Sequence, residues 1–140
     1  MVRFLHVMSA MVWVGGQLTI SVLLLPIVRD RLTGTDRADV MRQIGRRFGS
    51  FTITVFLPVQ IATGILLTWR AGVTVDSLGD PGYGRTLLAK LVVFALVMLA
   101  SGVHGWAQGT ARAGIARTFA IGTLLGSLVI VLLATALPGT

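Results

Sequence analysis

The chain contains no cysteine, so disulfides, thiolate metal sites and iron–sulfur clusters are excluded. It also contains no glutamate, and its only acidic side chains are five aspartates: Asp30, Asp36, Asp39, Asp76 and Asp80. All of them lie between apolar segments. Proton-coupled pumps and transporters usually place carboxylates inside the membrane. The sequence therefore argues against that class of protein.

Charged residues of any kind are scarce. They make up 12% of the 140 residues, whereas 54% are hydrophobic, and soluble domains carry about 25% charged residues. Apolar runs cover residues 4–28, 51–69, 86–107 and 118–137, each near the ~20 residues that a helix needs to cross a bilayer core of ~30 Å. The first run is too long for the apolar part of a signal peptide. We predict one all-α domain over residues 1–140, an integral membrane four-helix bundle.

The net charge of +7 is distributed unevenly between the loops. The loop after the first run holds Arg29, Arg31, Arg37, Arg42, Arg46 and Arg47, and the loop after the third holds Arg112 and Arg117. The opposite side holds only Arg3, Arg70 and Arg85 outside the runs. The positive-inside rule then places both termini outside. This pattern predicts a bacterial-type inner (cytoplasmic) membrane protein whose basic loops contact lipid and bind no nucleic acid.

The basic loop also has a helical pattern. Val40, Ile44 and Phe48 recur every four residues, and arginines fill the other faces. This pattern predicts a short amphipathic helix lying on the anionic inner leaflet. Pro26 is expected at a helix end, whereas Pro58 falls inside the second helix and is expected to kink it or to free a carbonyl near Thr54.

Polar side chains gather on narrow faces of two of the predicted helices. His6, Ala10, Trp13, Gln17 and Leu24 fall within about 40° of one line on the first helix. The third helix has a similar face: Lys90, Phe94, Val97, Ser101, His104 and Gln108. Such faces avoid lipid, so we expect them to face each other inside the bundle. The second helix adds Gln60 and Gly64 on one side.

Depth separates the two histidines. His6 begins its helix at the outer side, and Lys90 lies near the outer start of the third helix. His104 lies about 21 Å below Lys90 at 1.5 Å per residue. We therefore predict two polar layers and an outer site at His6. His104 is the weaker metal-ligand candidate.

Several segments resemble known membrane families. Three of them resemble successive helices of the CopD-like copper-resistance membrane domains: LHVMSAMVWVGG, RRFGSFTITVFLPVQIATGILL and YGRTLLAKLVVFALVMLASGVHG. The spacing of His6, Trp13, Gly15 and Gly16 is also similar to the HemJ-type protoporphyrinogen oxidases, four-helix membrane proteins that bind haem b. In that family a first-helix histidine and a third-helix lysine matter for function. The resemblance implies these roles for His6 and Lys90.

The first functional hypothesis is a b-type haem protein that carries electrons, or acts as an oxidoreductase on a small substrate or a quinone near the outer face. Neutral imidazole is a standard axial ligand of haem iron. Glycines would leave room for the macrocycle, and basic side chains would pair with its propionates. The predicted cofactor site comprises His6, Trp13, Gly16, Gln17, Gln60, Gly64, Arg70, Arg85 and Lys90.

Two alternatives stay open. Copper binding or transport is implied by the CopD-like resemblance, and Cu(I) favours imidazole and thioether ligands. The available ligands are His6, Met8, Met11, Met98 and His104, although Met8 and His6 lie about 160° apart on the helix. The third hypothesis is a non-catalytic subunit of a homo-oligomer or a membrane complex. It would pack through Gly122 and Gly126, whose spacing is typical of a close-packing seam.

Overall fold

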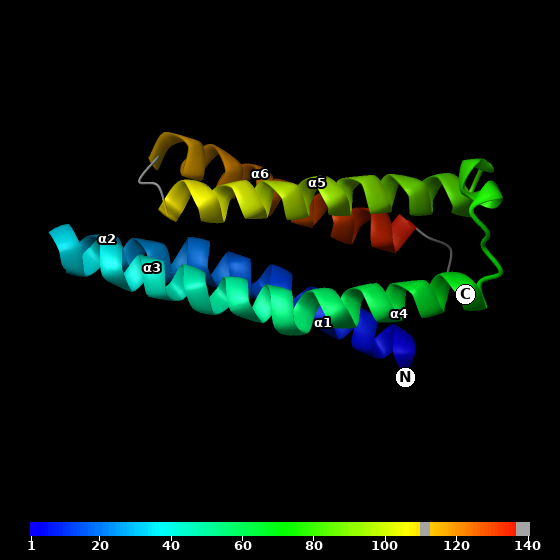
Figure 1. Ribbon diagram of the computed structural model, residues 1–140, viewed down its shortest axis with the longest axis horizontal. Helices are drawn as coiled ribbons and strands as arrows, with labels where there is room; N and C mark the ends of the chain where they lie inside the picture. The colour runs from blue at the N-terminus through cyan, green and yellow to red at the C-terminus, as the bar shows by residue number, and fades with distance from the viewer. Residues whose placement is uncertain (110–112, 137–140) are drawn as a thin grey trace. The chain divides into compact units, whose positions relative to one another are not determined.

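The computed structural model describes residues 1–109 and 113–136, and this part of the chain contains helices and no strand (Figure 1). Four helical stretches are long and apolar enough to cross a membrane: Val2–Arg31, Gly34–Arg70, Tyr83–Ala107 and Arg117–Thr135. The predicted all-α class and the four spans are therefore confirmed. Arg112, which contributed to the charge asymmetry, and Leu137, the predicted end of the last span, lie outside the described residues.

The first long helix consists of α1 (Val2–Leu18), the π-helical segment η1 (Thr19–Leu24) and α2 (Leu25–Arg31). Pro26 lies inside this continuous helix rather than at its end, which corrects the prediction. The π-helical segment directly precedes it, and the backbone N–H of Leu25 donates to Ile20 O, five residues back. A wider turn of this kind accommodates the proline ring without ending the helix.

The second long helix consists of α3 (Gly34–Phe51), the π-helical segment η2 (Thr52–Phe56) and α4 (Leu57–Arg70). Here too a π-helical segment precedes the proline, Pro58. The amphipathic helix predicted from the basic loop exists as α3, but it continues into η2 and α4 and is not a separate element. Its apolar stripe is half-buried, and the ring of Phe48 packs on Gly16 of α1. The second span thus begins at Gly34, and Phe48 of the apolar stripe packs it against the first helix.

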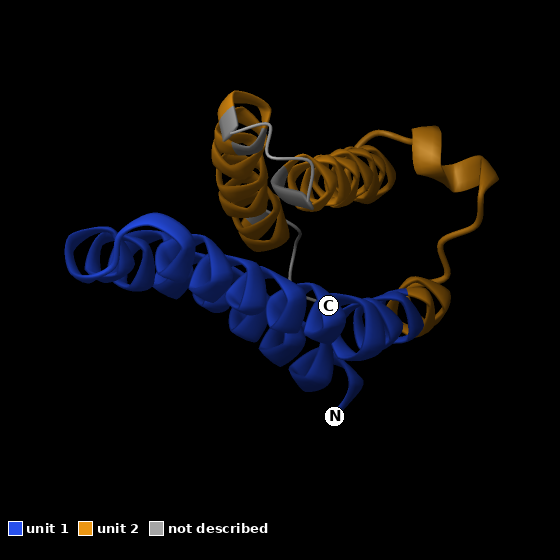
Figure 2. Cartoon of the chain, turned by 60° about the vertical axis from the view of Figure 1, so that its left-hand side comes forward, with its two compact units in different colours: residues 1–64 blue, residues 65–140 orange. Residues whose placement is uncertain are grey.

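The chain divides into two compact units, residues 1–64 and 65–140 (Figure 2). In the first unit, the two long helices run antiparallel and are joined by a tight turn in which Gly34 has a φ of +56°. Only a few large apolar side chains are buried there: Trp13, Val28 and Phe56. Many others are exposed along both helices, as expected for side chains that face lipid.

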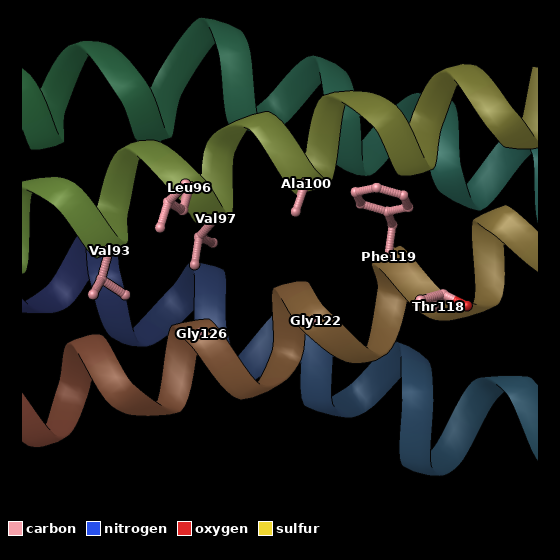
Figure 3. A pocket seen from close by; sticks show the side chains of 8 residues that line it. All are labelled: Val93, Leu96, Val97, Ala100, Thr118, Phe119, Gly122 and Gly126. Carbon is pink, nitrogen blue, oxygen red and sulfur yellow. The ribbon is translucent and has the colours of Figure 1, made fainter.

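The second unit contains the 3₁₀ turn η3 (Asp76–Gly79), α5 (Tyr83–Gly109) and α6 (Ala113–Ala136). Helices α5 and α6 approach closely at Gly126, where any Cβ would collide with Cγ2 of Val97. The expected seam is therefore built at Gly126. Gly122 instead lines an open apolar groove of about 340 Å³ between α5 and α6, into which Val93, Val97 and Ala100 point (Figure 3).

Candidate functional site

The polar face of the first helix contacts the second helix, whereas the sequence pattern predicts the third helix as its partner. Three contacts follow one another along the antiparallel pair. His6 meets Thr63, Trp13 meets Thr52, and Gly16 meets Phe48. Side chains three or four residues apart lie on one face of a helix, so this order is what a single contact stripe produces.

His6 is held at both ring nitrogens. Its Nδ1 lies 2.8 Å from Oγ1 of Thr63, and its Nε2 lies 3.1 Å from Nε2 of Gln60. Gln60 and Thr63 are each only 9% exposed, whereas the imidazole is half-buried. Burying an amide or hydroxyl without a hydrogen-bond partner is costly. The contacts with His6 give such a partner to the side chains of Gln60 and Thr63. The imidazole is thereby fixed in one orientation.

Ser9 and Gly64 complete the surroundings of the imidazole. The hydroxyl of Ser9 donates to Oε1 of Gln60 at 2.6 Å and also lies 3.0 Å from the backbone oxygen of His6. A Cβ on Gly64 would lie 3.5 Å from Cε1 of His6, which is ordinary contact distance. The ring edge therefore faces Gly64 of α4 across a space that would just hold a methyl group. We call Ser9, His6, Gln60 and Thr63 the His6 cluster.

Trp13 lies two turns further along α1 and belongs to the core. It is 2% exposed, and its indole stacks on Phe56 with centroids 4.6 Å apart and planes inclined by 5°. Its Nε1–H donates to Oγ1 of Thr52 at 3.0 Å. Thr52 in turn donates to the backbone oxygen of Phe48 at 2.8 Å. One face of the indole is thus occupied by the protein's own Phe56 ring.

The glycines of the predicted site differ in their surroundings. A Cβ on Gly16 would lie 2.7 Å from Cε2 of Phe48, so the absence of a side chain there admits the phenylalanine ring. A Cβ on Gly15 would meet nothing within 4 Å. Gln17 is half-buried roughly 16 Å along the helix from His6, beyond reach of the His6 cluster.

The remaining predicted residues belong to the second unit. Arg70 is exposed at the end of α4, and the Nε of Arg85 donates to the backbone oxygen of Gly79 at 3.1 Å. Lys90 and His104 are both half-buried in α5. Their roles as propionate or metal partners stay predictions. The structure therefore brings together His6, Gln60 and Gly64 of the predicted set.

Sequence reasoning missed Ser9 and Thr63, which contact the predicted residues directly. A signal was present, because Ser9 follows His6 by three residues and Thr63 follows Gln60 by three. Residues at that spacing share a helix face. A small hydroxyl on an apolar helix is easily assigned to backbone bonding, and Thr63 does donate to the backbone oxygen of Val59.

The donors around His6 limit what the site can bind. In residues 1–109 and 113–136, no group of three or more histidine, cysteine or carboxylate side chains is placed to hold a metal. Met8 and Met11 are 39% and 62% exposed on α1 and do not join the His6 cluster. The His6 cluster thus offers one imidazole together with hydroxyl and amide groups.

Neither a protein-family model nor a solved structure matches the chain. Two curated proteins are similar to it. An uncharacterized protein of Aquifex aeolicus (strain VF5) is 30% identical over 105 residues, which cover 74% of this chain and 66% of that protein. Copper transport protein CutJ of Bacillus subtilis (strain 168) is 30% identical over 138 residues, which cover 96% of this chain and 24% of CutJ. The chain thus spans less than two thirds of each relative. Its helices and this likeness make it a membrane-type helical protein similar to part of a copper transport protein.

Proposed function

We propose that this chain binds copper within the membrane through His6 and acts as a copper-transport module. The observation that carries the proposal is the His6 cluster, an oriented imidazole in a chain that resembles CutJ over 96% of its length. Imidazole is a good ligand for copper. Outer-shell hydrogen bonds of the Thr63 kind orient such ligands and raise their basicity.

A single imidazole suits transport better than storage. Tight Cu(I) sites combine several soft ligands, whereas the His6 cluster supplies one imidazole with hydroxyl and amide neighbours. A site that passes an ion onward needs binding that is favourable enough to capture it and weak enough to release it. We therefore propose that His6 is a transfer ligand, with the other copper ligands coming from outside the His6 cluster.

Haem b is the second candidate, and one observation favours it. One imidazole is sufficient as an axial ligand for haem iron, and one is what the His6 cluster provides. When bound, haem would supply one-electron transfer. Gly64 would leave the side of His6 uncrowded, whereas Phe56 and Phe48 fill the space beside Trp13 and Gly16. Those two residues therefore do not fit the predicted cradle for the macrocycle, and copper ranks first.

Metal analysis and a visible spectrum of one detergent-purified sample test the proposal. The cells are supplied with both copper and a haem precursor, so that neither is limiting. Copper that co-purifies with a colourless protein supports the proposed function. A Soret band that shifts on dithionite reduction, with iron in place of copper, transfers the assignment to haem. Protein that carries neither, and binds neither when titrated, leaves only the non-catalytic subunit.

A further inference from the structure

The hydrogen bonds of the His6 cluster run in one direction. The hydroxyl of Thr63 has a single proton, which it donates to the backbone oxygen of Val59 at 2.5 Å. Towards His6 the same oxygen therefore acts as an acceptor, 2.8 Å from Nδ1. Nδ1 must then carry a proton. In a neutral imidazole the other nitrogen, Nε2, is the acceptor.

The opposite end of the chain of hydrogen bonds agrees with this assignment. The hydroxyl of Ser9 has one proton and two acceptors within reach, Oε1 of Gln60 at 2.6 Å and the backbone oxygen of His6 at 3.0 Å, and the shorter contact directs the proton to Oε1. The amide nitrogen of Gln60 then faces Nε2 of His6 at 3.1 Å and donates to it. Ser9, Gln60, His6 and Thr63 thus form a chain in which each side chain donates to the next, ending on the carbonyl of Val59.

We propose that Thr63 and Gln60 are positioning residues that set the chemical state of His6. Thr63 holds it as the neutral Nδ1–H tautomer, so that Nε2 is the nitrogen that binds a metal. Gln60 shields Nε2 until an incoming ligand displaces its amide, and Ser9 restrains Gln60 in the shielding position. The consequence for copper rests on the proposed function, but the state of the imidazole does not.

The tautomer is tested in metal-free protein by ¹⁵N nuclear magnetic resonance of labelled histidine. The His6 signals are identified by their loss in His6→Ala. We expect a protonated Nδ1 and an unprotonated Nε2 in the wild type, and loss of this preference in Thr63→Val. The matched control is Thr54→Val, because Thr54 bonds the backbone oxygen of Ser50 in the same way but is exposed. A protonated Nε2 in the wild type, or an unchanged tautomer in Thr63→Val, overturns the role of Thr63.

The shield is tested with diethyl pyrocarbonate, which acylates an unprotonated imidazole nitrogen. His104 in the same molecule is the internal reference for the rate. Gln60→Leu is expected to raise the relative rate at His6 about fivefold, which corresponds to the ~1 kcal/mol net value of one hydrogen bond. Gln43→Leu, at an exposed position of α3, leaves the rate unchanged. An unchanged or slower rate in Gln60→Leu overturns the shield.

Neither experiment uses copper or haem, so both are independent of the proposed function. Protein that fails to bind copper but gives the expected signals and rates would defeat the proposed function alone. Protein that binds copper but shows a protonated Nε2 would defeat this inference alone.

Discussion

The two histidines of the chain occupy different environments, and this difference makes them a matched pair for mutation. His6 is fixed between Gln60 and Thr63, and His104 lies in α5 of the second unit. If His6 is the copper ligand, His6→Ala should reduce bound copper at least about tenfold, since packing cannot replace a coordinate bond. His104→Ala and Lys90→Ala should retain most of it. Copper per chain, measured on purified protein, checks this, and the reverse pattern would remove His6 from the site.

Two substitutions of Trp13 measure separately what its packing and its hydrogen bond contribute to the free energy of unfolding. Trp13→Phe keeps an aromatic ring against Phe56 but removes the bond to Thr52, so we expect a loss of about 1 kcal/mol of unfolding free energy. Trp13→Ala also removes the buried ring and should cost about 3–5 kcal/mol. Thermal unfolding in detergent measures both. Trp69→Ala, at a 75% exposed position, is the control. Equal losses in Trp13→Ala and Trp69→Ala would contradict the core role of Trp13.

At the scale of elements, the crossing of α5 and α6 depends on one of two glycines that lie one turn apart on α6. A Cβ on Gly126 would collide with Val97, whose branched side chain has little freedom to move, whereas a Cβ on Gly122 would meet nothing within 4 Å. Gly126→Ala should therefore destabilise the helix pair by about 1–3 kcal/mol. Gly122→Ala should be close to neutral.

Unfolding of the two glycine variants in detergent, under identical conditions, makes the comparison. Gly126→Ala combined with Val97→Ala should recover part of the loss, because it removes the methyl groups that the new Cβ meets. Equal stability of Gly126→Ala and Gly122→Ala would contradict the close approach at Gly126.

Because α3 is continuous with α4, most of the predicted basic loop is the first part of the second long helix. A helix of 37 residues is about 55 Å long, so about 25 Å extends beyond a ~30 Å bilayer core. The arginines of α3 are exposed, and Arg42 pairs with Asp39 at 3.3 Å on a solvated surface. From this length we expect the basic part of α3 to project beyond the membrane core rather than to form a separate helix on the leaflet.

At the scale of the whole molecule, the charge asymmetry predicts that both termini lie outside. Cysteines introduced at Thr35 and Ser77 would be the only ones in the chain. An impermeant thiol reagent added to intact cells should label Ser77→Cys and leave Thr35→Cys unlabelled until the membrane is opened. Thr35 is exposed in the first turn of α3, and Ser77 lies in η3 of the second unit. Labelling of Thr35→Cys in intact cells would reverse the topology.

Much of the fold follows from the sequence. Apolar runs of span length have one stable form in lipid, because each backbone polar group must be paired within its own helix. The spans were therefore predictable, and the likeness to CutJ supports the copper part of the family resemblance. The helix ends were not predictable, because a π-helical segment lets Pro26 lie inside a helix and because exposed arginines do not end one, so that α3 continues into α4.

The candidate site was likewise predictable from the sequence only in part. A helical wheel assigns His6, Trp13 and Gln17 to one face of a helix, and the sequence by itself determined that face. It did not determine which helix lies opposite, or in which register. Those depend on how Phe48 fits against Gly16 and Phe56 against Trp13, since close-packed side chains interlock in few ways. Only that packing brings Thr63 and Gln60 to the two nitrogens of His6, because a hydrogen bond needs its partners within about 3 Å and a wheel carries no distance between helices.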